Sequence, residues 1–143
     1  MKHEIVLPGA GKNYEWAKDH VFVKSAFELS HGRVTFVEDR LKPGFQLARH
    51  HHKKMLEIFY VLEGSVEFVF DDEAVRAGPG TTLNVPPDVW HEVRSPEGAR
   101  LLTIFTPGGF DHYLEELVAL TEAQYADAAF MKALGHKYDI FEA

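Results

Sequence analysis

Short apolar runs separated by glycine and proline fill the first three quarters of the chain. Runs rich in Val, Ile, Phe, Leu and Thr lie at residues 20–29, 33–41, 57–62, 65–70, 81–85, 89–94 and 100–105. Turn signals such as Pro43-Gly44 and Gly78-Pro79-Gly80 stand between them. Strands at such regular spacing are typical of an all-β sandwich or barrel, so we expect a barrel over about residues 20–107.

The hydrophobic pattern changes to helical spacing in the last quarter of the chain. Residues 110–120 carry apolar side chains at this spacing, namely Leu114, Leu117 and Val118. Thr121 followed by Gln124 has the form of a capping box, and the helix it begins is expected to end at Gly135. We therefore predict one domain over residues 1–143, with C-terminal helices at about 110–135 that cover the barrel.

The composition of the chain limits the classes of function that the protein can have. The chain has 143 residues, of which 45% are hydrophobic and 26% charged, as expected for one globular domain. Its net charge of -7, without a basic cluster, argues against a nucleic-acid partner because such a surface repels phosphate. No secretory apolar region and no 18-residue apolar run are present, which argues against a membrane partner and predicts a cytoplasmic protein.

The chain has nine histidines but no cysteine. The absence of cysteine excludes disulfides, thiolate nucleophiles and every cysteine-based zinc or iron–sulfur site. If the protein binds a metal ion, imidazole and carboxylate groups must hold it.

One group of histidines has spacing that suits a metal site. On a strand, His50 and His52 share one face while His51 faces away. Glu57 begins the next apolar run, where an antiparallel partner strand would lie beside the first. His91 lies between apolar residues, a costly place for an imidazole without a partner. These residues predict a metal site, although spacing alone leaves chance placement open.

The same segments resemble two motifs of the cupin superfamily. The stretch from Gly44 to Gly64 matches the first cupin motif, G(X)5HXH(X)3–4E(X)6G, at every specified position. The stretch from Gly80 resembles the second motif, G(X)5PXG(X)2H(X)3N, and departs from it at Asp88 and Ser95. Neither departure falls on a ligand position, so both leave the metal-binding set intact.

The resemblance covers about residues 30–107 and implies a small single-domain cupin with a jelly-roll barrel, also called a double-stranded β-helix. It further implies one divalent transition metal ion per chain, held by His50, His52, Glu57 and His91. This donor set suits Fe, Mn, Ni, Cu or Zn. Cupins commonly dimerise, so a homodimer through faces such as those of Tyr60 and Trp90 is expected.

Strand parity also predicts a substrate wall. Counting in steps of two from the ligands gives Gln46, Ala48, Phe59, Val61, Val89 and Val93. For Phe59 and the valines, ordinary filling of the barrel is an equally good interpretation. No Lys, Arg, Tyr or Asp falls on these positions, which favours an apolar or aromatic substrate over a phosphosugar.

The segment Leu101–Leu117 also resembles the end of the barrel in small bacterial cupins similar to quercetin dioxygenases. That resemblance implies a metal-dependent dioxygenase in which Glu57 is the catalytic base and a diketone-type or aromatic small molecule chelates the ion. Two alternatives stay open: a non-catalytic cupin that binds a metal or small molecule for sensing or storage, and a metal-dependent decarboxylase or isomerase. The other six histidines are expected at the surface.

Overall fold

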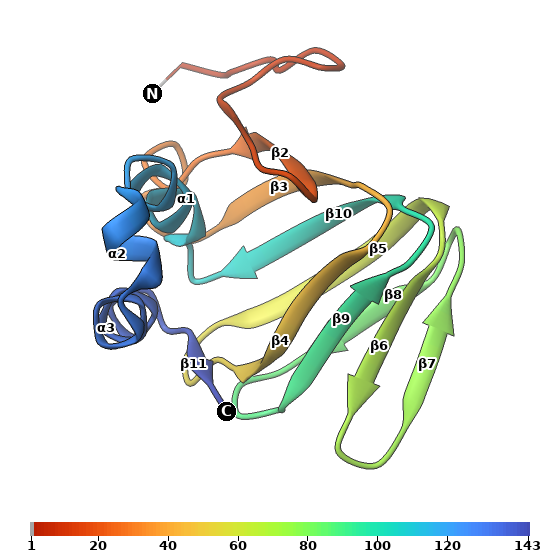
Figure 1. Cartoon of the computed structure of the whole chain (residues 1–143). Coiled ribbons are helices and arrows are strands. Elements are labelled where there is room, and N and C mark those ends of the chain that lie inside the picture. Colours follow the sequence, from red (N-terminus) through yellow and green to blue (C-terminus); the bar gives the residue numbers. More distant parts are fainter. Residues whose placement is uncertain (1) are drawn as a thin grey trace.

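Two antiparallel sheets face each other in the computed structural model, which describes residues 2–143 (Figure 1). The first sheet has the order β1 (Asn13–Glu15), β2 (Asp19–Ser25), β3 (Thr35–Leu41), β10 (Ala99–Thr106), β5 (Leu56–Gly64) and β8 (Thr82–Val85). The second has the order β11 (Phe141–Glu142), β4 (Phe45–His51), β9 (His91–Ser95), β6 (Val66–Phe70) and β7 (Ala74–Ala77). This arrangement confirms the all-β jelly-roll prediction.

Alternating side chains of the strands fill the space between the sheets. Burial alternates along β9 and β10, as expected for strands with one inward and one outward face. Val61, Val66 and Phe68 are completely buried in the larger of two apolar clusters, which fills the barrel end that carries the β6–β7 hairpin. This end of the barrel is solid core.

The helices gather at the other end of the barrel (Figure 1). Leu114 of α1 (Phe110–Val118) packs with Val21, Val37 and Phe105 in a second apolar cluster. The helices α2 (Glu122–Ala126) and α3 (Ala128–Lys137) continue from α1. As predicted, the apolar face of α1 covers the barrel. Within residues 2–143, no helix is both long and apolar enough to cross a membrane.

The predicted second helix differs from the observed structure. Its capping box is present, since Thr121 accepts an N–H from Gln124 while the Gln124 side chain accepts one from Thr121. Asp127 then ends α2 and caps α3, which continues past Gly135. A Cβ at Gly135 would lie 3.0 Å from the carbonyl oxygen of Ile140, so this glycine permits a close approach of the chain. The left-handed residue that follows the helix is Asp139, with φ of 65°.

Four strands lie outside the apolar runs that predicted the others. These are β1, β4, β7 and β11. Three of them have four residues or fewer, and β4 has charged or polar residues at most positions, so none gives a strong hydrophobic signal. Edge positions in the sheets explain part of this pattern, because β1, β7 and β11 each pair with a single strand.

Replacement of Phe68 by alanine tests the location of the core. Phe68 is 0% exposed, and Phe68→Ala should lower the free energy of unfolding by about 3–5 kcal/mol because it removes a large buried ring. Tyr60 is 42% exposed, so Tyr60→Ala should cost far less, about 0.5 kcal/mol. Urea denaturation followed by circular dichroism measures both, and equal losses would contradict this placement of the core.

Candidate metal centre and cavity

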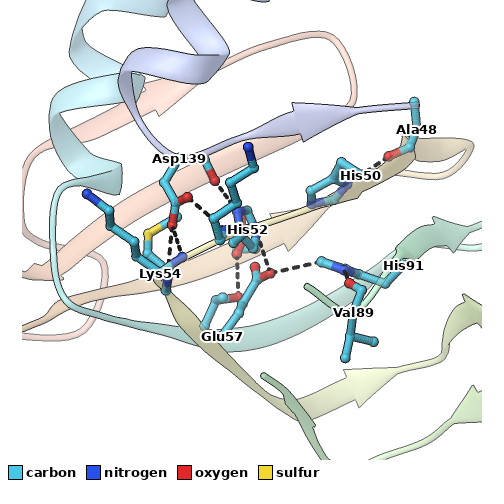
Figure 2. A network of polar contacts seen from close by, with 12 residues as sticks. Ala48, His50, His52, Lys54, Glu57, Val89, His91 and Asp139 are labelled. Carbon is cyan, nitrogen blue, oxygen red and sulfur yellow. Dashed lines mark hydrogen bonds and ion pairs between the residues drawn. The ribbon is translucent and has the colours of Figure 1, made fainter. Parts of the chain in front are cut away.

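Four side chains predicted from the sequence meet inside the barrel (Figure 2). His50 comes from β4, His52 follows that strand directly, Glu57 comes from β5 and His91 begins β9. All four are buried, with exposed fractions between 0% and 4%, and their potential ligand atoms lie within 4.8 Å of one another. The structure therefore brings together the whole predicted ligand set.

Backbone carbonyl groups fix the orientation of the three imidazole rings. Each Nδ1 lies at hydrogen-bond distance from a carbonyl oxygen: 2.8 Å for His50 and Ala48, 2.8 Å for His52 and Asp139, and 2.9 Å for His91 and Val89. A ring that donates its Nδ1 hydrogen to a carbonyl presents Nε2 for metal coordination. The contacts are those expected for metal-binding histidines.

The centre of this group needs a positive charge. Oε1 of Glu57 lies 3.1 Å from Nε2 of both His52 and His91. If Nδ1 carries the hydrogen of each neutral ring, two nitrogen lone pairs and a carboxylate oxygen face one another. Protons or a metal cation between these atoms relieve that repulsion. The residues present therefore fit a bound divalent ion.

Burial and mutual charge shift the pKa values within the group. Burial alone would raise the pKa of Glu57, but the hydrogen bonds and charges of His52 and His91 lower it to about 2. Burial and the charge of His91 lower the pKa of His50 to about 4. Burial lowers the pKa of His52, yet the hydrogen bond and charge of Glu57 raise it above the usual value overall. An ionised carboxylate and a neutral His50 are the forms that metal binding requires.

A residue that the sequence analysis missed holds this group in place. The left-handed Asp139 lies in the loop before β11, and its carbonyl oxygen is the partner of His52. Its carboxylate accepts backbone N–H groups of Lys53, Lys54 and Met55 at 2.8–2.9 Å. These three residues form the turn between His52 and Glu57 (Figure 2). The C-terminal segment thus clamps the turn that carries two of the four candidate ligands.

A cavity of about 450 Å³ lies between the sheets and the helices. Its wall is mostly apolar and rich in aromatic side chains, including Trp16, Phe45, Phe59, Phe105, Phe110 and Tyr113. Glu57 is the member of the four-residue group that lines it. The carboxylate of Glu57 therefore faces the histidines and also borders the cavity.

Some of the residues predicted for the substrate wall line this cavity, and others do not. Phe59, Val93 and Gln46 line it, whereas Val61 is buried in the core cluster and Val89 packs against that cluster. Ala48 is exposed and does not line the cavity.

A β-bulge explains why parity failed in β4. Leu47 pairs with Val93 and His50 pairs with His91, so three steps along β4 match two along β9. The bulge reverses the alternation between His50 and the start of the strand. Phe45 and Leu47, rather than Ala48, therefore join Val93 on the cavity side, with Gln46 beside them.

Charged and polar side chains outside the positions predicted by parity also line the cavity. Lys18, Asp19, Asp39 and Tyr113 all line the cavity. They come from β2, β3, α1 and the residue before β2, none of which carries a candidate ligand. Parity counted from the ligand strands gives no information about these elements, so the sequence could not place them.

Comparisons with known proteins agree with this architecture. Residues 37–105 match the Cupin domain family. An RmlC-like cupin from Shewanella frigidimarina has 18% identity and a TM-score of 0.65, over 78% of this chain and 96% of that one. KdgF from Halomonas sp. has 18% identity and a TM-score of 0.62, over 71% and 92%. A variant of Streptomyces PAC13 with uridine has 17% identity and a TM-score of 0.62, over 76% and 85%. No curated protein matches the chain.

Removal of one imidazole should abolish tight metal binding. His91→Ala deletes an Nε2 directed at the centre, and we expect Ni²⁺ affinity to fall by more than 100-fold, the upper range for outer-shell partners. His51→Ala is the matched control, because His51 packs against Trp90 and Phe141 outside the group. Isothermal titration calorimetry measures both, and equal affinities for the two variants would contradict the ligand assignment.

Loss of the Asp139 carboxylate should weaken the same site indirectly. Asp139→Ala removes the acceptor of three N–H groups, so we expect Ni²⁺ affinity to fall about 10–100-fold. Asp139→Asn keeps one acceptor oxygen and tolerates positive φ, and should lose less. The same calorimetric titration measures this order. Wild-type affinity in the alanine variant would show that the clamp does not position the ligands.

Proposed function

We propose that this chain, whose residues 37–105 match the Cupin domain family, is a metal-dependent dioxygenase acting on a neutral, largely apolar small molecule that chelates the ion through oxygen. The observation that carries the proposal is the position of Glu57. Its side chain belongs to the four-residue His/Glu group and also lines the aromatic cavity. A molecule in the cavity would therefore reach the ion from the side of this carboxylate.

The character of the cavity supports the substrate class. Its wall is mostly apolar, and its volume of about 450 Å³ lies in the range of sites for small organic ligands. Asp19, Asp39 and Glu57 contribute acidic groups, whereas Lys18 donates its ammonium hydrogen to the carbonyl of Pro43 at 3.1 Å. Away from the metal centre, an anionic group would therefore meet the carboxyl groups of Asp19 and Asp39. A neutral aromatic compound with adjacent oxygen atoms fits better.

Each group of residues at the site would have a distinct role in the reaction. When bound, a divalent transition metal ion would supply Lewis acidity and open coordination positions for oxygen ligands. Glu57 would accept the proton of a chelating hydroxyl at one of its carboxylate oxygens, because this side chain borders both the histidines and the cavity. Phe59 and Phe105 would orient the substrate, while α1 and α2 would keep water from the cavity through residues such as Leu114 and Tyr125.

The carboxyl groups of Asp19 and Asp39 favour a second candidate, a metal-dependent isomerase or decarboxylase. Such an enzyme needs acid–base groups beside the substrate, and these two side chains line the cavity. A non-catalytic cupin would instead hold a zinc ion with all four residues and leave no open position. The identity of the bound metal, together with the presence or absence of turnover, distinguishes these functions.

Oxygen uptake tests the leading proposal. We would load the protein separately with Fe²⁺, Mn²⁺, Ni²⁺ and Cu²⁺ and measure O2 consumption with flavonols and with β-diketones. At least one combination should turn over, and Glu57→Gln should lower kcat by about 10²–10⁴-fold because it removes the base. His51→Ala should keep wild-type activity. No O2 consumption with any of the four metals and either substrate class would contradict the dioxygenase assignment.

A further inference from the structure

Two aspartates face each other inside the cavity, away from the cupin motifs. Asp39 of β3 lies opposite Val21 of β2, so Asp19, two residues before Val21, shares its face. The two carboxyl groups lie close enough to hydrogen bond, and both line the cavity. Thr103 of β10 donates its hydroxyl hydrogen to Oδ2 of Asp39 at 3.1 Å. The pair is therefore held by three adjacent strands.

The surroundings of the pair require a shared proton. Oδ1 of Asp19 is buried, and no N–H or hydroxyl group of residues 2–143 is placed to donate to it. Burial and the charge of Asp39 raise the pKa of Asp19. Burial, with the charges of Glu57 and Glu38, also raises the pKa of Asp39, although Asp19 and Thr103 donate to it. Two such carboxylates cannot both ionise at this distance, so one proton remains between them near neutral pH.

Other charged groups around the pair do not remove this requirement. Lys42 and the backbone N–H of His20 both act to lower the pKa of Asp19, but burial outweighs them. The ammonium group of Lys42 is bound to Glu15 at 2.7 Å and to the carbonyl of Trp16 at 3.1 Å. Lys18 also lines the cavity, but its ammonium group donates to the carbonyl of Pro43, so among residues 2–143 neither aspartate is in an ion pair with a lysine.

The pair and Glu57 line one cavity at positions that are separated along β10. On β10, Phe105 lies opposite Glu57, Leu101 lies opposite Asp39, and Thr103 lies between them on the same face. All three residues of β10 line the cavity. A molecule lying along this strand would meet Glu57 at one end and the aspartate pair at the other.

We propose that Asp19 and Asp39 form a proton-sharing pair that recognises a hydroxyl group on the end of the substrate remote from the metal centre. This inference rests on the proposed function, because it assumes that the cavity holds the substrate. The ionised carboxylate accepts the hydroxyl hydrogen, while the proton shared between the two side chains keeps the pair at a single negative charge. A neutral hydroxyl can donate to this carboxylate, whereas a carboxylate or phosphate would be repelled. The substrate class is therefore a flat apolar molecule with chelating oxygens at one end and a hydroxyl group at the other.

Binding of two matched flavonols tests this inference. The probes are 3-hydroxyflavone and 3,3′,4′-trihydroxyflavone, which share the chelating end and differ in the hydroxyl groups at the other end. Fluorescence titration of Zn²⁺-loaded protein under argon measures Kd without turnover. The wild type should bind the trihydroxy compound about tenfold or more tightly than the other, as hydrogen bonds to a charged group predict. Equal affinities, or no binding of either flavonol, would overturn the inference.

The variants identify the residues responsible. In Asp19→Leu/Asp39→Leu the preference should fall to within about twofold while Zn²⁺ affinity stays at the wild-type value, which shows that the metal site is intact. Asp72→Asn, at an exposed position between β6 and β7, is the control and should keep the preference. A preference retained in the double variant overturns the proposal even if the protein is a dioxygenase. If oxygen uptake fails but the preference follows the pair, the dioxygenase assignment falls and the recognition site stands.

Infrared spectroscopy tests the shared proton without any ligand. The wild-type spectrum at pH 7 should contain a protonated carboxylic acid C=O band that Asp19→Asn lacks, because the remaining Asp39 ionises once its partner is neutral. Asp72→Asn should retain the band. A wild-type spectrum without such a band at pH 7 would show that the pair holds no proton and would overturn the proposed mode of recognition.

Discussion

Repulsion among three imidazole nitrogens and one carboxylate, all inside a barrel, is the constraint on which the site depends. His50, His52, Glu57 and His91 are almost fully buried, and each imidazole Nδ1 lies at hydrogen-bond distance from a carbonyl oxygen. Among residues 2–143, Glu57 is the hydrogen-bond partner of Nε2 in both His52 and His91. Burying such a group without a compensating charge is costly, and a cation at this position would compensate it.

Several other parts of the fold support this group of three histidines and one glutamate. The solid core around Phe68 fixes one end of the barrel, and α1 closes the other over the cavity. The C-terminal strand β11 pairs with β4 beside His50 and His51. The preceding Asp139 then caps the turn that leads to Glu57. The C-terminal segment therefore supports the candidate metal centre and also covers the barrel.

The sequence could predict what depends on local spacing. The ligands follow from parity, from the turn between His52 and Glu57, and from the two motifs, all within short stretches of chain. The strands followed from apolar runs wherever those runs were strong. Parity failed at the bulge between Leu47 and His50, because an extra residue there depends on pairing with β9.

The alignment of segments that are far apart in the chain could not be predicted from the sequence. The aspartate pair needs the alignment of β2 with β3, and Asp139 is 87 residues from its partner His52. These groups change the interpretation of the cavity, since they place an acidic pair along it in addition to the candidate metal centre.

X-ray absorption spectroscopy of the Ni²⁺-loaded protein tests the central claim most directly. The account predicts one ion per chain, with scattering from three imidazole rings, one carboxylate oxygen and at least one further oxygen ligand from solvent. That result would establish both the ligand group and an open position for substrate. A spectrum without imidazole scattering, or a four-coordinate ion with no solvent ligand, would contradict it.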